Sequence, residues 1–322
     1  MRALEETLRR IFPLDSAEEE TWRLRLAASA QAEGEPAFDA ARLAGRLAGI
    51  GRGPLHPHKP LLAIFTAAHG IAMKRLLAAV APTPAMPITA ATIPAMPVFV
   101  IDMGGGDNFD QTAVNSMAAV KPLSRPTAPY CADISRGPAM SIAIARQAVE
   151  SGIGLLEEWR QYDLFAIACQ GRGVLYAASA IAIRCLGEYQ AADLPVGIEA
   201  ALLSEIISVA CDGKTGLELL AAFGGFDLAG AAGLMLALAA NRQPIVLADF
   251  PAVSAALLAV RLEPFIRDYL FAVPAAVSAQ CPLHQAALTL LGAPPLDPGQ
   301  NLERSLSALI AASSLFIEAG RA

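Results

Sequence analysis

The chain has few charged and aromatic residues and no long apolar segment that is free of helix breakers. Charged residues make up 17% and aromatic residues 6% of its 322 residues, whereas 55% are hydrophobic and the mean hydropathy is +0.46. The longest uncharged run, residues 269–296, contains prolines at positions 274, 282, 294 and 295. Because proline breaks the interior of a helix, this run cannot form a transmembrane helix of roughly 20 apolar residues. We therefore expect no membrane partner, and a composition this apolar predicts a large buried core.

Basic stripes, paired cysteines and metal-ligand clusters are also missing. A net charge of -6 argues against a nucleic-acid partner, which a basic surface would attract. The five cysteines, at positions 131, 169, 185, 211 and 281, show neither disulfide nor metal-ligand spacing, so we expect a reducing compartment, no metal and no cofactor. Glu5 and Glu6 lie where a signal peptide needs an apolar run, which predicts a cytoplasmic protein.

Short apolar runs alternate with helical patterns over most of the chain. This alternation predicts an α/β fold in which a parallel, Rossmann-like sheet is flanked by helices. The expected strands are residues 61–66, 98–103, 164–169 and 245–247. The expected helices include residues 16–31, with Asp15 or Ser16 as the N-cap, 40–50, 143–159 and 302–319. Open parallel sheets bind ligands at the carboxyl ends of their strands, so we expect the functional site there.

Two adjacent glycines, Gly224 and Gly225, precede an acid and a helix of small and apolar residues. The glycines permit positive φ angles and a close approach of the backbone to other groups. Asp227 is placed to cap or to charge the start of the helix. Residues 229–240 are almost all small or apolar, and such a helix must be packed tightly. The alternative to a ligand-binding turn is an ordinary strand-to-helix turn of an α/β protein.

Four short segments carry a resemblance to a known family. They read Ala-Ala-His-Gly-Ile at 67–71, Val-Ile-Asp-Met-Gly at 100–104, Ile-Ser-Arg-Gly-Pro-Ala-Met-Ser at 134–141 and Phe-Gly-Gly-Phe-Asp-Leu at 223–228. In order and spacing they resemble the nicotinate-nucleotide:dimethylbenzimidazole phosphoribosyltransferases, which make the lower-ligand nucleotide of cobalamin. Weak motifs that occur in one fixed order are more specific than any one of them.

The resemblance implies an architecture, an activity and a set of site residues. Residues 1–57 and 285–322 would form a small helical domain beside a large α/β domain of residues 58–284, and the protein would be a homodimer. The low charge content agrees with a partner that covers part of the surface. The reaction would transfer phosphoribosyl from nicotinate mononucleotide to an aromatic base. The implied pocket-lining residues are His69, Asp102, Gly104, Cys169 and Tyr176, and the implied nucleotide- or phosphate-binding residues are Gly171, Arg172, Gly173, Gly224, Gly225 and Asp227.

Residues 168–176 depart from the family pattern. The family has a Gly-Glu-x-Gly-x-Gly-Asn-Thr-Thr loop that supplies polar groups to the nucleotide, where this chain has Ala-Cys-Gln-Gly-Arg-Gly-Val-Leu-Tyr. Gly171 and Gly173 can still form a tight turn that faces an anion, and Arg172 offers a charge to a phosphate. The carboxylate is replaced by Cys169, however, and the Asn-Thr-Thr run is lost.

A second departure affects the general base. The family's Leu-Gly-Glu-Gly-x-Gly-Ala segment, whose glutamate is held to be that base, aligns with residues 296–301 and places Pro298 at the glutamate position. Proline cannot accept a proton. Asp297 is the best substitute, although Pro298 restricts it to extended conformations and its side chain points in a different direction.

These departures leave two functions of different class. The first is a diverged phosphoribosyltransferase whose activity is lost or strongly reduced, because three independent losses would all have to be compensated. The second is a non-catalytic protein that binds a nucleotide or an aromatic base, or that serves as the partner subunit of an intact paralogue.

Overall fold

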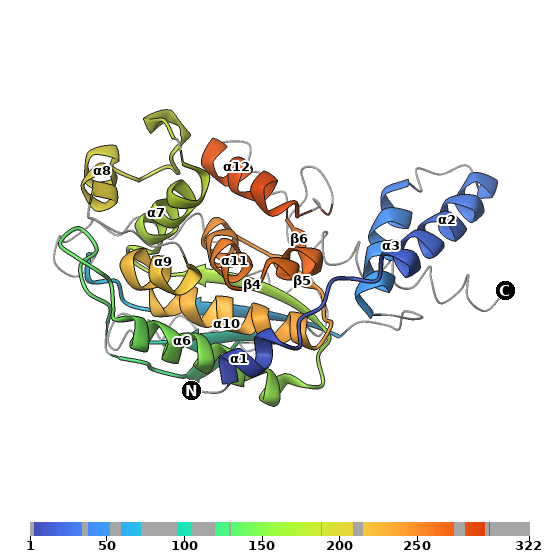
Figure 1. The fold of residues 1–322 in the computed structure, drawn as a ribbon, viewed down its shortest axis with the longest axis horizontal. Helices are drawn as coiled ribbons and strands as arrows, with labels where there is room; N and C mark the ends of the chain where they lie inside the picture. Colours follow the sequence, from blue (N-terminus) through green and yellow to red (C-terminus); the bar gives the residue numbers. More distant parts are fainter. Residues whose placement is uncertain are drawn as a thin grey trace.

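The core of the protein is a six-stranded parallel sheet with the strand order β3-β2-β1-β4-β5-β6 (Figure 1). The computed structural model describes residues 3–33, 38–51, 59–71, 96–104, 120–128, 130–187, 189–208, 215–273, 281–293 and 296. The strands are β1 (Pro60–Thr66), β2 (Val98–Asp102), β3 (Val120–Ser124), β4 (Leu164–Gln170), β5 (Ile245–Leu247) and β6 (Leu270–Ala272). From β1 the chain builds the sheet outward through β2 and β3, then returns to β4 and builds the other half. The parallel α/β fold predicted from the sequence is thereby confirmed.

The two strands that the sequence did not predict are the edge strands. The four interior strands begin and end within one residue of the expected ranges. By contrast, β3 contains a lysine and a proline. An edge strand tolerates proline and charge because one of its sides has no neighbouring strand, so β3 lacks the continuous apolar pattern that identifies a buried strand. The other edge strand, β6, is apolar and buried but has 3 residues, and so short an apolar run cannot be told from a buried helix segment by its pattern alone.

Helices α2 (Ser16–Glu33) and α3 (Phe38–Gly51) form a hairpin that projects from the sheet-containing body (Figure 1). Asp15 is the N-cap of α2, as predicted, since its side chain accepts a hydrogen bond from the Glu18 N–H at 3.1 Å. Arg242 holds the end of α3 to the body by donating to the carbonyl oxygens of Gly49 and Ile50. The expected C-terminal helix, residues 302–319, lies outside the described residues, so the bounds of the small domain stay a prediction.

The remaining helices surround the sheet. Helix α1 (Ala3–Leu8) packs on α6 (Ile142–Gly154), and the 3-10 helix η2 (Leu155–Trp159) follows α6 directly, so the predicted helix 143–159 consists of two parts. Three helices pack on α11 (Phe250–Leu262): α7 (Val174–Leu186), α9 (Gly216–Phe223) and α12 (Pro282–Leu291). The others are η3 (Ala191–Asp193), α8 (Ala200–Ser208) and η4 (Pro264–Tyr269). Within the described part of the chain, none of these helices has the length and apolar character needed to cross a membrane.

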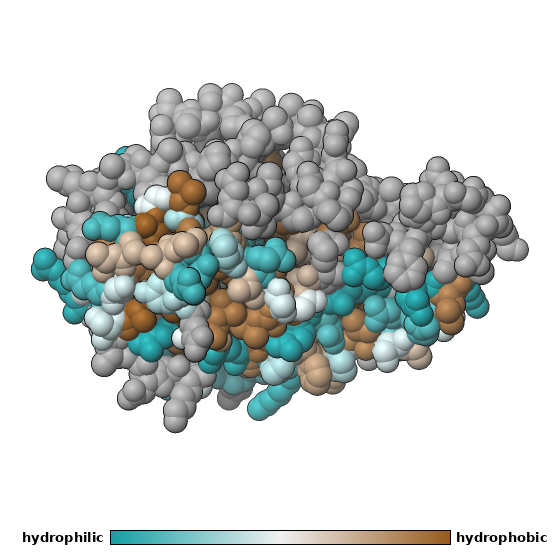
Figure 2. All heavy atoms as spheres, turned by 90° about the horizontal axis from the view of Figure 1, so that it is seen from above, coloured by the Kyte–Doolittle hydropathy of each residue, from teal (hydrophilic) through white to brown (hydrophobic). Residues whose placement is uncertain are grey.

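The described surface is mixed in character. Figure 2 shows patches of apolar side chains between hydrophilic ones on the face that it presents. Large apolar residues that are exposed include Phe12, Leu24, Tyr130, Ile142, Val196, Phe265 and Leu290. They come from separate elements, and single exposed apolar residues of this kind are normal on protein surfaces.

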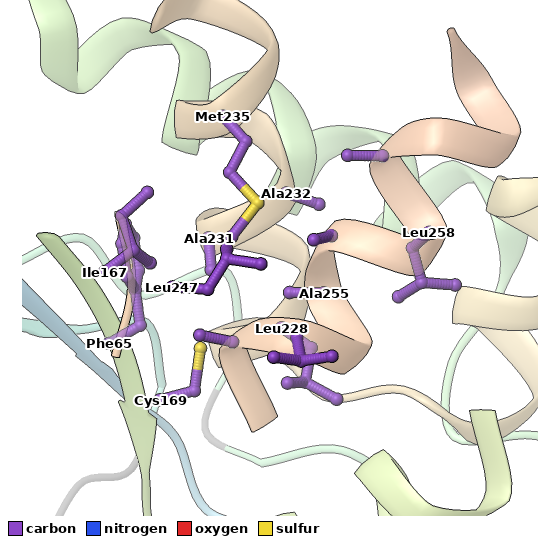
Figure 3. Close-up of a cluster of buried hydrophobic side chains, with 14 of the residues drawn as sticks. Phe65, Ile167, Cys169, Leu228, Ala231, Ala232, Met235, Leu247, Ala255 and Leu258 are labelled. Carbon is purple, nitrogen blue, oxygen red and sulfur yellow. The ribbon is translucent and has the colours of Figure 1, made fainter. Parts of the chain in front are cut away.

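Helix α10 (Phe226–Ala240) is buried along its whole length. It contacts β1, β4 and β5 of the sheet, with α11 beside it and α6 against another side. Figure 3 shows Ala231, Ala232 and Met235 of α10 packed among side chains of the strands and of α11. Tight packing of residues 229–240, predicted from their small and apolar side chains, is thereby confirmed.

The crossing of α6 and α10 depends on glycine. A Cβ atom added at Gly152 of α6 would lie 2.0 Å from the carbonyl oxygen of Gly230, and one at Gly233 of α10 would lie 2.0 Å from that of Val149. Both contacts are with backbone, which cannot move aside as a flexible side chain can. The two helices therefore pack backbone against backbone.

We predict that Gly152→Ala lowers the free energy of unfolding by about 1–3 kcal/mol, because the added methyl group forces the two helices apart. Chemical denaturation followed by circular dichroism measures this change. Gly154→Ala is the matched control, since it lies in the same helix with nothing within 4 Å of the added Cβ. Equal stability of the two variants would contradict the close crossing.

Candidate functional site

The carboxyl ends of the central strands lie at one level. Thr66 of β1 is in register with Asp102 of β2 on one side and with Gln170 of β4 on the other. The strands β1 and β4 are neighbours, but the connection after β1 leads to β2 on one side, whereas the connection after β4 leads to β5 on the other side. In open parallel sheets, such a reversal creates a crevice at the carboxyl ends of the two strands, where ligands bind.

The turn between β4 and α7 has the glycine conformations that its sequence predicts. Gly171 has φ 154° and Gly173 has φ 89°, and helix α7 starts directly afterwards at Val174. A Cβ atom at Gly171 would lie 2.9 Å from the carbonyl oxygen of Ala67, so the turn runs close to the loop that follows β1. Arg172, between the two glycines, is exposed. The turn thus presents an exposed cation beside the N-terminus of a helix, a combination suited to anions.

A buried ion pair joins the loop after β1 to the first turn of α10. Nε2 of His69 lies 3.0 Å from Oδ2 of Asp227, and the two side chains are 1% and 0% exposed. Gly225 makes room for the pair, since a Cβ there would lie 2.3 Å from Cε1 of His69. Burial lowers the pKa of His69, but Asp227, together with the neighbouring Cys131, more than compensates and keeps that pKa well above its ordinary value. The imidazole is therefore charged at neutral pH.

Of the two roles that the sequence allowed for Asp227, the structure excludes that of helix cap and agrees with that of a charge in the first turn. Gly225 is the N-cap residue of α10, and Asp227 lies inside the first turn, where its Oδ1 accepts a hydrogen bond from the Leu228 N–H at 2.8 Å. The side chain charges the start of the helix, as expected, but points to His69 rather than to solvent. Gly224 ends α9 and is also buried.

Asp249 is a site residue that the sequence interpretation missed. It follows β5, and its two carboxylate oxygens accept hydrogen bonds from the N–H of Ala252 at 2.8 Å and from the N–H of Cys169 at 3.0 Å. It thereby caps α11 and connects that helix to the end of β4. An acid directly after a buried strand was the available signal in the sequence.

The titration of Asp249 is shifted by its surroundings. Burial raises the pKa of Asp249 to about 7; the hydrogen bonds from Ala252 and Cys169 act in the opposite direction, and the nearby Asp227 adds to the increase. Burial, followed by the charges of Asp249 and Asp227, also raises the pKa of the Cys169 thiol well above its ordinary value. Cys169 is therefore a neutral thiol, and Figure 3 shows its side chain in the apolar cluster formed with Leu228 of α10.

The other residues predicted for the site have varied positions. Asp102 is partly exposed, and its side chain accepts a hydrogen bond from the N–H of Gly104 at 2.9 Å. Tyr176 is 3% exposed, and its hydroxyl accepts a hydrogen bond from the N–H of Glu199 at 3.1 Å. Asp297 lies outside the described residues.

A further polar group lies in the segment that follows β3. Asp133 is 4% exposed and accepts hydrogen bonds from both the N–H and the hydroxyl of Ser135. Cys131, two residues earlier, forms an isolated bridge with His69. The segment thus closes over the His69 loop. Across the described ranges, no three His, Cys, Asp or Glu side chains are grouped so that they could hold a metal ion.

The strand order and the parallel direction of all six strands define a doubly wound α/β protein of the Rossmann type. A family model described as "Phosphoribosyltransferase" matches residues 39–316. The chain is 31% identical over 347 aligned positions to the nicotinate-nucleotide–dimethylbenzimidazole phosphoribosyltransferase of Roseiflexus sp. (strain RS-1), with 97% of this chain and 93% of that protein covered. The protein of the same name from Chloroflexus aggregans (strain MD-66 / DSM 9485) is 31% identical, with 84% and 82% covered.

Solved structures agree with these sequence matches. A crystal structure of nicotinate-nucleotide–dimethylbenzimidazole phosphoribosyltransferase from Thermus thermophilus superposes with a TM-score of 0.70 at 25% identity and covers 95% of this chain and 94% of that one. The chain belongs to the nicotinate-nucleotide–dimethylbenzimidazole phosphoribosyltransferase family, as its motifs suggested.

We predict that His69→Ala lowers the free energy of unfolding at pH 6 by about 3–5 kcal/mol, because it leaves the buried Asp227 carboxylate without a partner. A group whose pKa is raised on folding stabilises the protein fully below its unfolded pKa and loses that effect as the pH rises through its folded pKa. The deficit should therefore shrink at strongly alkaline pH. Denaturant titrations at several pH values measure it, and a pH-independent deficit would contradict a charged His69.

The control is the double variant His69→Leu with Asp227→Leu. It removes both charges together, and replacing a buried ion pair by apolar side chains is less costly than removing one partner. We expect it to be more stable than His69→Ala.

Proposed function

We propose that this protein is a diverged phosphoribosyltransferase that binds a nucleotide at the carboxyl edge of its sheet and whose transfer to dimethylbenzimidazole is lost or strongly reduced. One observation carries this proposal. The turn after β4 retains backbone N–H groups and the exposed Arg172 for a phosphate, whereas the residues at the positions of the family's polar loop, Cys169 and 174–176, are buried.

The residues that replace the polar loop have become part of the core. Cys169 is 1% exposed, and Val174 and Leu175, in the first turn of α7, are 3% and 7% exposed. The hydroxyl of Tyr176 accepts its hydrogen bond from the backbone of Glu199. None of these side chains can supply the carboxylate or hydroxyl contacts of the family's loop by a change of rotamer alone. The loss of polar contacts therefore supports reduced turnover.

What remains around the turn still suits a phosphate. With their positive φ angles, Gly171 and Gly173 form a tight turn that allows a close approach to the backbone, and α7 contributes the positive end of its dipole. Arg172 is exposed and adds a full charge. We propose these three residues as the phosphate contacts, with His69, Asp227 and Gly225 as the support behind the pocket. Asp102 and Gly104 are proposed to line its β2 side.

The second candidate is a non-catalytic protein that binds a nucleotide or an aromatic base, or that pairs with an intact paralogue. The same buried loop residues favour it, because binding a phosphate requires only the turn, whereas catalysis also requires groups that stabilise the transition state. A missing general base alone lowers a rate by about 10²- to 10⁴-fold. Measuring turnover and binding separately distinguishes the two candidates.

We predict that nicotinate release from nicotinate mononucleotide and dimethylbenzimidazole is slow or absent, while calorimetry detects binding of the mononucleotide. Arg172→Ala should weaken that binding at least about tenfold, because a charge-assisted hydrogen bond to phosphate is worth about 1.5–3 kcal/mol. Chromatography of the reaction mixture measures nicotinate.

Arg160→Ala is the control for Arg172→Ala. It removes an exposed arginine that precedes β4 and so lies at the opposite, amino end of the same strand. Its nucleotide affinity should equal that of the unmodified protein. Rapid turnover in the unmodified protein would overturn the reduced-activity proposal, and absence of nucleotide binding would overturn the binding site.

We also propose that the protein is a homodimer, with a heteromer that includes an intact paralogue as the alternative partner arrangement. The support is its apolar composition with only 17% charged residues. Light scattering at micromolar concentration should give twice the chain mass of 33.5 kDa. A monomer under these conditions would contradict the homodimer.

A further inference from the structure

Four titratable side chains lie close to the ends of β1, β4 and β5, and they differ in their exposure to solvent. His69, Asp227 and Cys169 are buried, whereas Asp249 is partly exposed. A group that exchanges a proton with a ligand must reach it directly or through one water molecule. Among these four residues, Asp249 alone retains solvent exposure, which makes it the candidate for this exchange.

The Asp249 carboxylate is held in a fixed orientation. One oxygen accepts a hydrogen bond from the N–H of Ala252 at 2.8 Å and the other from the N–H of Cys169 at 3.0 Å. Cys169 lies two residues before Gly171, so the carboxylate is tied to the strand that leads into the turn proposed to bind phosphate. Each oxygen can accept more than one hydrogen bond, which leaves capacity for a ligand.

Burial is the main reason why Asp249 is a proton acceptor near neutral pH. The hydrogen bonds from Ala252 and Cys169 oppose this effect and the charge of Asp227 of α10 adds to it, while Cys169 of β4 is a neutral thiol. On the α12 side, the ring of His284 lies 5.4 Å from that of Phe250, and burial lowers the pKa of His284 to about 4, so it adds no charge. With a pKa of about 7, Asp249 can both accept and release a proton at the pH of the reaction.

We propose that Asp249 is the catalytic base of the transfer that this protein retains. The bond between the ribose C1′ atom and the nicotinate nitrogen breaks, and nicotinate leaves with the electron pair. A nitrogen of the azole base forms the new bond to C1′, and the proton of its N–H passes to the Asp249 carboxylate. This inference rests on the proposed function, in the form in which activity is reduced rather than lost.

The competing explanation is that Asp249 serves only as the N-cap of α11. The substitution Asp249→Asn keeps the capping role, because its amide oxygen can accept the hydrogen bond from the N–H of Ala252, but an amide cannot accept a proton from an azole. It also removes the acceptor for the N–H of Cys169, so the pH profile, and not the rate alone, separates the two roles. Asp15→Asn is the matched control, since Asp15 is also an N-cap, in the α2–α3 hairpin. Asp249→Ser, which keeps a capping oxygen, provides a second variant if the asparagine variant fails to fold.

The experiment measures nicotinate release with protein in excess over nicotinate mononucleotide, between pH 5.5 and 8.5, with dimethylbenzimidazole as the acceptor. We expect the rate of the unmodified protein to rise with pH, with a midpoint near 7, because the ionised carboxylate is the active form. Asp249→Asn should lower the rate at pH 8 by about 10²-fold or more and abolish the pH dependence, with mononucleotide affinity unchanged. Asp15→Asn should keep both the rate and the pH profile.

Several outcomes would overturn Asp249 as the base. They are an unchanged rate in Asp249→Asn, a rate that does not vary between pH 6 and 8 in the unmodified protein, and a loss of activity in Asp297→Asn instead. Complete absence of nicotinate release would also overturn it, while mononucleotide binding in the same samples would leave the proposed function intact. Absence of mononucleotide binding would overturn the proposed function itself.

Discussion

Helix α10 can occupy the middle of this protein because the charge in its first turn is neutralised by His69. A lone carboxylate in that position would carry a desolvation cost of several kcal/mol. His69 offsets this penalty at a contact of 3.0 Å, and Gly225 leaves the space that the imidazole needs. The sheet, α6 and α11 all pack on α10, so the packing of the α/β body requires that this charge is either paired or absent.

Burial sets the electrostatics at the carboxyl edge of the sheet. It raises the pKa values of both Asp249 and Cys169 at the ends of β5 and β4, and the charge of Asp227 adds to both increases. The result is one neutral thiol inside the core and one carboxylate that titrates near neutral pH at its border. Packing of the core thereby influences the chemistry available to a ligand outside it.

The chain has the fold of its family, and its sequence departs from the family pattern in the loop proposed to bind the nucleotide. The small-residue crossing of α6 and α10 and the glycine turn after β4 depend on backbone contacts that few substitutions can preserve. In contrast, Cys169 and Val174 are compatible with the fold because their side chains enter the core as apolar groups. Positions that pack in the core and positions open to a ligand are thus neighbours within one loop.

Local patterns in the sequence determined the interior strands, the cap at Asp15, the tight packing of α10 and the glycine turn at residues 171–173. These features follow from apolar periodicity, capping and backbone freedom, which depend on residues close together in the chain. The edge strand β3 lacks such a pattern and β6 is too short for its apolar run to be distinctive, so only pairing with β2 and β5 defined them. The contacts of His69 with Asp227 and of Asp249 with Cys169 join residues 158 and 80 positions apart. Tertiary structure alone decided them, because the parallel register of the strands brings their carboxyl ends to one edge.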